Sequence, residues 1–304
     1  MVHGEPENLI TYMQKIIEKA SVLIEAMPFI QAFRGATVVI KFGGSAMEDK
    51  ACHDSILTDT AFLECVGLRP IIVHGGGKAI SRRMAEAGLQ PAFVNGMRVT
   101  DEATVHLVEE VLNHEVNVEI VETLIARGAR ATGIQGPSIL RAEKTFSLDK
   151  ATGQPMDIGF VGKITGVEPA PITACLEADI IPVITPLARG ADGAVYNINA
   201  DESAAAIAQA VRARKLVFLS DVPGLLRDPQ NPDSIISTLK RSDVESLIKD
   251  GVIAGGMLPK IRGALDALAT GVRKVHIVDG RMPHSLLLEI FTDQGIGTEI
   301  IQDE

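Results

Sequence analysis

Two glycine-rich turns, each directly after an apolar run, limit what this chain can fold into more than any other feature. Residues 37–45 read TVVIKFGGS, and residues 70–78 read PIIVHGGGK. A short apolar run that ends at glycines is typical of a buried strand that passes into a helix. The bare backbone N–H groups of such a turn can face an anion. Each turn alone could be a tight connection without a ligand, but the pair predicts that a phosphate is approached from two sides. Neither turn has the spacing G-x-x-x-x-G-K-[ST] or G-x-G-x-x-G, which argues against a dinucleotide-dependent dehydrogenase.

Composition narrows the class of protein. The chain has 304 residues, 46% hydrophobic and 22% charged, which is enough for one large α/β domain or two modest lobes. A net charge of -10 argues against a nucleic-acid or anionic-membrane surface. The three cysteines are scattered without a CxxC motif, no apolar run is long enough to span a membrane, and the N-terminal residues are charged. These features predict a reduced, cytoplasmic protein.

Residues 8–27 have the pattern of an amphipathic helix, which Pro28 is expected to end or kink. Apolar side chains recur at steps of three and four, as on one helix face, at Leu9, Met13, Ile16, Ala20, Leu23 and Met27. Such a stripe must be buried, either against its own domain or against a second subunit. We treat residues 1–34 as a separate helical segment with a predicted role in oligomerisation, and residues 35–304 as the main domain.

Beyond residue 35 the chain alternates between strand-like and helix-like segments. The strand-like runs are 38–41, 71–74, 180–185, 216–220 and 274–278, and the helical ones are 78–87, 101–126, 201–213, 242–249 and 260–268. This order predicts an α/β fold with a mostly parallel sheet and helices on both faces. Ligands in such folds bind beyond the carboxyl ends of the strands, where both glycine turns and the turn 221–224 would lie. Residues 130–170 predict β-hairpins that could cover a site.

Two lysines and an aspartate are the main candidates for chemistry. Lys41 ends an apolar strand beside Gly43 and Gly44, where its ammonium group can meet a phosphate oxygen or simply extend to water. Lys260 follows GGMLP at a helix start, a position that opposes the helix dipole unless an anion binds there. Asp201 precedes an alanine-rich helix, so it either caps that helix or organises lysines around a phosphate.

Other polar residues bear on the choice of ligand. Arg98 precedes a helix and can bind a carboxylate through two hydrogen bonds or form a surface ion pair. Asn197 or Asn199 can form a hydrogen bond with the substrate. His106, Glu110 and His114 lie at steps of four on one predicted helix face, a spacing that can bind metal. The acidic residues around them favour a solvated helix face instead, and we predict no protein metal site.

Five segments in this order resemble the amino acid kinase family and, within it, the branch that phosphorylates N-acetylglutamate. They are KFGGS (41–45), HGGG (74–77), NGMRVT (95–100), NINAD (197–201) and GGMLPK (255–260). The resemblance runs from about residue 36 to the C-terminus, and NGMRVT is its most discriminating part. It implies a three-layer αβα sandwich, with an acyl amino acid-binding lobe at about 35–190 and an ATP-binding lobe at about 191–304. The implied reaction transfers the γ-phosphoryl group of ATP, with Mg²⁺, to the γ-carboxylate of N-acetyl-L-glutamate, the second step of arginine biosynthesis.

The resemblance also implies roles for individual residues. Lys41 and Lys260 would stabilise charge on the transferring phosphoryl group, and Asp201 would hold both lysines in place. The substrate would be bound by Gly75, Gly76, Arg98 and Asn197, and ATP by Gly43, Gly44, Ser220, Asp221 and Gly224. No protein side chain needs to attack, because the substrate carboxylate is the nucleophile. Catalysis would then consist of positioning and electrostatics.

The segment 276–298 resembles the arginine-inhibited members of that branch, in which an N-terminal helix links dimers into a hexamer. This implies a homo-oligomer built as a trimer of dimers, a nitrogen-signalling protein as a candidate partner, and feedback inhibition by L-arginine at Tyr12, Lys215, His276 and Glu289. The turn 132–138 departs from the usual pattern of the family, and Lys78 and Lys163 are unusual beside glycine turns. Two alternatives stay open: a kinase for another acyl amino acid, and a catalytically weak arginine-sensing or partner-binding module.

Overall fold

The computed structural model describes residues 9–149, 152–292 and 295–303. The α-helices are α1 (Leu9–Phe33), α2 (Lys50–Cys65), α3 (Gly77–Glu86), α4 (Glu102–Glu110), α5 (Asn117–Ala126), α6 (Gly136–Ile139), α7 (Ala170–Glu177), α8 (Ala200–Ala210), α9 (Val244–Lys249), α10 (Met257–Ala269) and α11 (Ser285–Ile290). A π-helix, η2 (Val111–Val116), joins α4 to α5, and short 3-10 helices are η1 (Gly44–Met47), η3 (Pro232–Ser234) and η4 (Arg241–Asp243). The strands are β1 (Thr37–Phe42), β2 (Arg69–His74), β3 (Phe93–Val94), β4 (Met97–Arg98), β5 (Ala131–Ile134), β6 (Leu140–Leu148), β7 (Pro155–Val167), β8 (Ile181–Ile184), β9 (Leu187–Gly190), β10 (Val195–Asn197), β11 (Lys215–Ser220), β12 (Thr238–Lys240), β13 (Lys274–Asp279) and β14 (Thr298–Ile301).

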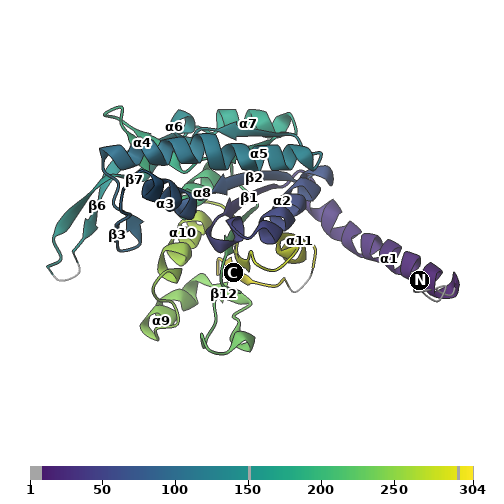
Figure 1. Ribbon diagram of the computed structural model, residues 1–304. Helices are drawn as coiled ribbons and strands as arrows, with labels where there is room; N and C mark the ends of the chain where they lie inside the picture. The colour runs from purple at the N-terminus through teal and green to yellow at the C-terminus, as the bar shows by residue number, and fades with distance from the viewer. Residues whose placement is uncertain (1–8, 150–151, 293–294, 304) are drawn as a thin grey trace, which may run out of the picture.

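An eight-stranded sheet forms the centre of the molecule (Figure 1). Its order is β12-β14-β13-β11-β1-β2-β8-β5, and each pair is parallel except β13 with β14. Strands from the first part of the chain form one half of the sheet and strands from the last part form the other. They meet where β1 pairs with β11. The expectation of a mostly parallel sheet is therefore confirmed.

Helices cover both faces of this sheet, which gives the three layers expected. Side chains alternate along β1, so Val39 joins the apolar cluster beneath α7, α8 and α10, while Val38 and Ile40 join the cluster beneath α2, α4, α5 and α11. Strands buried on both faces need continuous apolar runs, which explains why the sequence predicted them. Lys41 continues the row of Val39 and therefore points toward α8 and α10.

The segment 130–170 forms a long antiparallel hairpin, β6 with β7, as expected. Together with β9 and β10 it closes a small barrel beside the sheet. The short pair β3 and β4 turns at Asn95 and Gly96, both with positive φ, as a tight type I′ hairpin requires. Asn95 Nδ2 donates to Ser147 Oγ over 2.9 Å, which joins this hairpin to β6.

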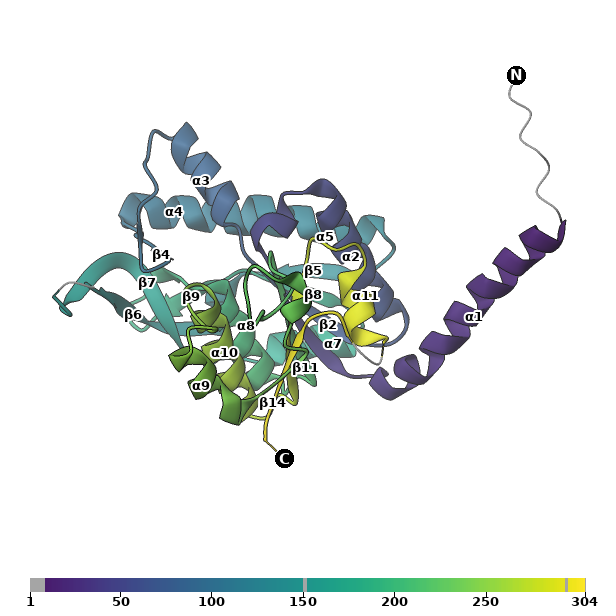
Figure 2. The same ribbon diagram turned by 90° about the horizontal axis from the view of Figure 1, so that it is seen from below.

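Helix α1 projects from the body of the molecule in both views (Figures 1 and 2). It does not end at Pro28 but continues to Phe33. The final turn is held to the core because the guanidinium of Arg214 lies over the Phe33 ring and donates to Ala32 O. The predicted boundary was therefore too early: the helix continues past Pro28, and Arg214, just before β11, holds its last turn. In the part of the chain that the structure describes, no helix is long and apolar enough to cross a bilayer.

Candidate active site

The two glycine turns lie against each other at the carboxyl ends of β1 and β2. Gly75 N–H donates to Phe42 O over 2.7 Å. A Cβ atom at Gly75 would lie 3.6 Å from Gly43 Cα, and one at Gly43 would lie only 2.9 Å from Lys41 Nζ. A side chain at Gly43 would therefore displace the ammonium group of Lys41, whereas a Cβ at Gly75 would only make van der Waals contact with the first turn.

Asp201 lies between two lysines beside these turns. Its Oδ2 accepts a hydrogen bond from Lys260 Nζ over 2.7 Å, and its Oδ1 is 3.0 Å from Lys41 Nζ. The Lys41 contact is an ion pair without hydrogen-bond geometry, so Oδ1 keeps an acceptor position open. Asn199 caps α8 by accepting from Asp201 N–H. Because Asn199 serves as the cap, the carboxylate of Asp201 is left to bind the lysines.

Burial and charge set the protonation of this trio. Burial alone would raise the pKa of Asp201, but Lys41 and Lys260 together lower it below its ordinary value. Burial also lowers the pKa of Lys41, against the opposing attraction of Asp201. Asp201 is therefore ionised at neutral pH, and the trio has one more positive than negative charge when both lysines are protonated. That excess suits an incoming anion.

A cavity of about 390 Å³ opens beside the trio, within the range of small-molecule sites. Lys41 and Asp201 line this cavity. All four predicted substrate residues line it as well: Gly75, Gly76, Arg98 and Asn197. The structure therefore brings these predicted residues to one place. Lys163, noted in the sequence as unusual, also lines the cavity.

Arg98 is held at the cavity by helix α3. It donates to Gly77 O over 2.7 Å and to Ser81 Oγ over 2.8 Å, and its guanidinium lies over the Phe93 ring. The position of Arg98 thus depends on the position of α3.

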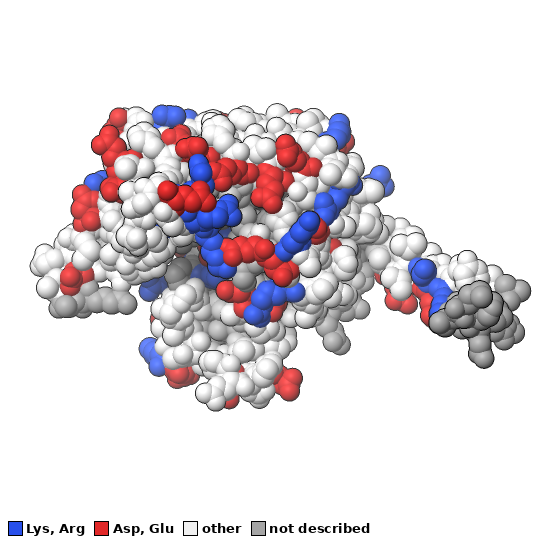
Figure 3. Space-filling model, in the orientation of Figure 1, with Lys and Arg blue, Asp and Glu red and all other residues white. Residues whose placement is uncertain are grey.

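Helix α3 buries only Ile80 and Met84, and exposed ion pairs lie at both of its ends. Lys78 pairs with Glu48 at one end of the helix. At the other end the pairs are Arg82–Glu115, Arg83–Glu110 and Arg83–Glu115. Figure 3 shows interspersed basic and acidic side chains across the face that carries α3 and α4.

The predicted ATP residues lie at the same edge of the sheet but outside this cavity lining. Gly43 and Gly44 follow β1, whereas Ser220 ends the neighbouring strand β11 and Asp221 and Gly224 follow it. The charge of Asp221 raises the pKa of Lys41, after the larger effects of burial and Asp201. The turn is held to β14 because Leu225 N–H donates to Thr298 Oγ1 over 2.8 Å.

A second polar cluster lies on the opposite face of the sheet from Lys41. His276 and Glu289 are joined by a 2.5 Å contact from Nδ1 to Oε1, and both are buried together with Lys215. Glu289 Oε2 also accepts from the N–H groups of Ile296 and Gly297. Burial lowers the pKa of Lys215 to about 8, with Glu289 opposing that change. The structure therefore places these three predicted residues together.

Tyr12 does not join that cluster within one chain. The residue of α1 that contacts Lys215 is Phe33, whose ring lies beneath Lys215 Nζ. Tyr12 is 21 positions earlier in the same helix, so about 30 Å separates it from Phe33 at 1.5 Å per helical residue.

Among residues 9–149, 152–292 and 295–303 no group of three or more His, Cys, Asp or Glu side chains is placed to hold a metal ion.

Several cavity residues were not identified from the sequence. Leu112, Val161 and Glu202 line the cavity, and Leu112 Cδ2 would be 2.5 Å from a Cβ at Gly76. No short motif marks them, since they come from the π-helix, the β6–β7 hairpin and the first turn of α8. Only the π-helix has a general association with functional sites.

Comparison with known proteins agrees with this geometry. Acetylglutamate kinase of Akkermansia muciniphila is 47% identical over 291 residues, which is 95% of this chain and 98% of that protein. N-acetylglutamate synthase from Neisseria gonorrhoeae, complexed with coenzyme A and N-acetyl-glutamate, has a TM-score of 0.81 at 27% identity, over 94% of this chain and 64% of the synthase. The same synthase with coenzyme A and L-arginine has a TM-score of 0.76 at 28% identity, over 93% of this chain and 65% of the synthase. Residues 36–279 match the model of the amino acid kinase family, and the chain therefore belongs to that family.

Proposed function

We propose that this chain transfers the γ-phosphoryl group of ATP to the γ-carboxylate of N-acetyl-L-glutamate, giving N-acetyl-L-glutamyl 5-phosphate and ADP. The observation that carries the proposal is the buried Lys41–Asp201–Lys260 trio beside two bare glycine turns and a substrate-sized cavity. The 47% identity to a protein named acetylglutamate kinase supports the choice of substrate.

The residues present suit a reaction that needs positioning and charge, not a protein nucleophile. A substrate carboxylate oxygen attacks the γ-phosphorus while the bond to the β,γ-bridging oxygen breaks, and the electron pair leaves with ADP. Lys41 and Lys260 neutralise charge on the transferring group, and Asp201 fixes their ammonium groups. Mg²⁺ would enter with ATP, held largely by the nucleotide and water, and would neutralise further charge on the phosphates.

The cavity residues orient the acceptor. Arg98 is anchored to α3 through Gly77 O and Ser81 Oγ, and its charge suits a substrate carboxylate. Asn197 supplies an amide at the same wall. We assign the nucleotide to Gly43, Gly44, Ser220, Asp221 and Gly224, which lie at the carboxyl ends of β1 and β11.

The test measures ADP release from Mg-ATP with N-acetyl-L-glutamate, and with L-glutamate, L-aspartate and N-acetyl-L-aspartate as comparison substrates. Turnover only with N-acetyl-L-glutamate is expected. Turnover with another acyl amino acid would favour the first alternative, and ATP binding without turnover would favour a sensing module. Lys260→Met should abolish most activity, whereas Lys249→Met, an exposed lysine on α9, should not.

We also propose that L-arginine inhibits the protein at Lys215, His276 and Glu289. A buried carboxylate beside a lysine of lowered pKa has no part in phosphoryl transfer as described, and a guanidinium could replace that lysine as its partner. The arginine complex of the related fold supports this choice. Titration of ADP release with L-arginine tests it, and unchanged turnover at millimolar arginine would exclude this site.

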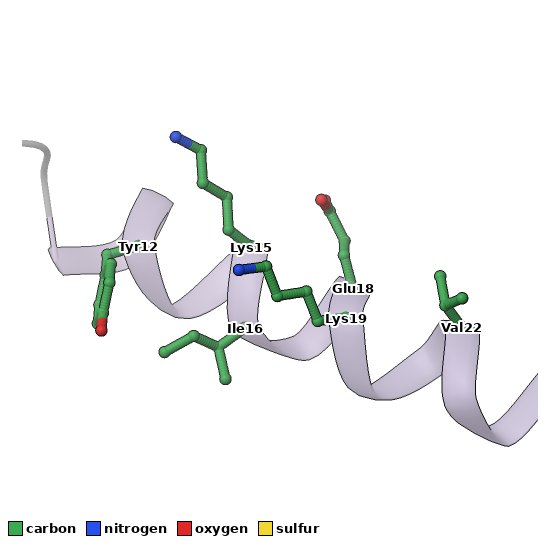
Figure 4. Close-up of a pocket in the computed structure, with 6 residues that line it drawn as sticks. All are labelled: Tyr12, Lys15, Ile16, Glu18, Lys19 and Val22. Atoms are coloured by element: carbon green, nitrogen blue, oxygen red, sulfur yellow. The ribbon is translucent and has the colours of Figure 1, made fainter. Parts of the chain in front are cut away.

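We infer that α1 joins a second copy of this chain, as in a trimer of dimers. Six residues of α1 line a surface hollow (Figure 4), and within residues 9–149, 152–292 and 295–303 no other element contributes to its lining: Tyr12, Lys15, Ile16, Glu18, Lys19 and Val22. Large apolar side chains of α1 are about half exposed or more, among them Ile17, Val22, Leu23 and Ile24. A hollow built on one helix needs a second surface to become a closed site. Light scattering of the intact chain and of Leu23→Glu should give a hexamer and a smaller species; a monomer or plain dimer for the intact chain would refute the inference.

A further inference from the structure

A buried histidine supports the second glycine turn from below. His74 is fully buried at the end of β2. Its Nδ1 is 2.7 Å from Gly75 O, and its Nε2 is 3.1 Å from Asn117 Nδ2. Asn117 Nδ2 also donates to Val183 O over 2.9 Å. These contacts form a chain from the neighbouring strand β8 through α5 to the turn.

The partners determine which ring nitrogen carries the proton. A carbonyl oxygen can only accept, so Nδ1 must carry hydrogen and donate to Gly75 O. Nε2 then accepts from the amide of Asn117. Burial lowers the pKa of His74 to about 4, so the ring is neutral near pH 7. The ring therefore has one tautomer and one orientation, both set by its neighbours.

The direction of Gly75 O determines the direction of the next N–H group. In a planar trans peptide the C=O and the following N–H point in opposite directions. Because Gly75 O faces the buried ring of His74, Gly76 N–H faces away from it. Gly76 lines the cavity, and its N–H donates to no other residue in the described part of the chain.

We propose that His74 is a positioning residue which, by holding Gly75 O, aims Gly76 N–H at an oxygen of the phosphoryl acceptor or of the transferring group. The proposal rests on the function proposed above. It gives the reaction a fixed backbone donor in the cavity that Lys41 and Asp201 also line. Removing one fixed donor of this kind lowers kcat by about 10²–10³-fold in acyl transfer.

The surroundings leave little freedom for this arrangement. A Cβ at Gly76 would meet Leu112 Cδ2 at 2.5 Å, and a Cβ at Gly133 would meet Asn117 Oδ1 at 2.1 Å. Asn117 is the first residue of α5 after the π-helix. The extra residue per turn of a π-helix shifts the following side chains around the axis, and here it accompanies an amide that reaches the ring.

Two substitutions separate the two ring nitrogens. An asparagine amide can occupy the place of Nδ1, whereas a glutamine amide reaches the place of Nε2. His74→Asn should keep the donor to Gly75 O and retain kcat within about 5-fold, while His74→Gln should lose it and lower kcat by about 10–100-fold. The KM for ATP should change by less than about 2-fold in both. His53→Gln is the matched control, because His53 is also a buried histidine but lies on α2; it should keep wild-type kcat.

A crystal structure of His74→Gln gives a readout that does not need turnover. A changed orientation of the Gly75–Gly76 peptide supports the inference even if the substrate is a different acyl amino acid. An unchanged peptide, or equal kcat for the Asn and Gln variants, would overturn it. Loss of activity in the intact chain toward all four tested acceptors would instead count against the proposed function.

Discussion

Replacing Asp201 with asparagine removes one charge while keeping the shape of the side chain. Asp201 is 3.0 Å from Lys41 Nζ and 2.7 Å from Lys260 Nζ, and all three side chains are less than one-fifth exposed. With an effective dielectric constant of 20, each contact is worth about 5–6 kcal/mol of Coulomb energy before desolvation. Loss of one member of a buried ion pair costs about 3–5 kcal/mol. We expect the free energy of unfolding to fall by about 3 kcal/mol, because the asparagine itself is cheaper to bury than a carboxylate.

In Asp201→Asn we also expect a large loss of catalytic rate, beyond the effect of the lower folding stability. Both ammonium groups lose the group that holds them, so we expect kcat to drop by about 10³-fold. The variant should also acquire a new pH dependence. Burial already lowers the pKa of Lys41, and the attraction of Asp201 opposes that change. Without Asp201 the pKa of Lys41 falls further, so residual activity should decline as pH is raised and the ammonium loses its proton.

The assay is ADP release with N-acetyl-L-glutamate at pH 6.5, 7.5 and 8.5, with chemical unfolding of each variant. Glu48→Gln is the control, since its pair with Lys78 has a similar 2.6 Å contact but exposed side chains; it should cost under about 1 kcal/mol. Wild-type kcat for Asp201→Asn, or a decline in activity with pH identical to that of the wild type, would refute the assigned role of the trio.

Three further predictions follow from the same contacts. Gly76→Ala should lower kcat at least about 10-fold, because its Cβ would meet Leu112 Cδ2 at 2.5 Å, whereas Gly166→Ala, whose nearest neighbour is at 3.9 Å, should not; ADP release distinguishes them. The pKa of His74 is about 4 when folded and 6.5 when unfolded, so the unfolded state binds the proton first. The free energy of unfolding should be unaffected by this histidine above about pH 6.5 and fall by up to about 3 kcal/mol toward pH 4. Urea unfolding at several pH values should show this decline in the wild type, and His74→Asn should lack the part due to His74. Glu289→Gln should abolish inhibition by L-arginine at unchanged kcat and lower the melting temperature, since a buried carboxylate with three partners is lost; retained inhibition would exclude Glu289 from the site.

The central strands could be predicted because their burial on both faces leaves a direct mark in the sequence. β1 and β11 are buried along nearly their whole length, and their central residues 38–40 and 216–219 form uninterrupted apolar runs. Helix α2 left no comparable signal and was not predicted. It buries His53, Asp59 and Thr60 together with apolar residues, which breaks the apolar pattern that identifies a helix.

The role of Asp201 could not be decided from the sequence, because a helix cap and a lysine partner require the same residue at the same place. The structure distinguishes them through Asn199, which occupies the capping position. The same limit applies to Tyr12. Its position on an amphipathic helix was evident, but a single chain places it far from Lys215, so its predicted role depends on the proposed assembly of copies.

The alternation of side chains along two adjacent strands explains why the site needs both layers of helices. β1 and β2 pair in register, with Lys41 opposite Val73 and Phe42 opposite His74. Lys41 therefore points toward α8 and α10, where Asp201 and Lys260 lie, whereas His74 points toward α5, where Asn117 lies. The charges of the site come from one face of the sheet and the orientation of the glycine turn comes from the other. A slip of one residue between the strands would move His74 out of line with the first glycine turn and break the Gly75 N–H to Phe42 O bond that joins the two turns. The register of the central pair is thus the feature on which both halves of the site depend.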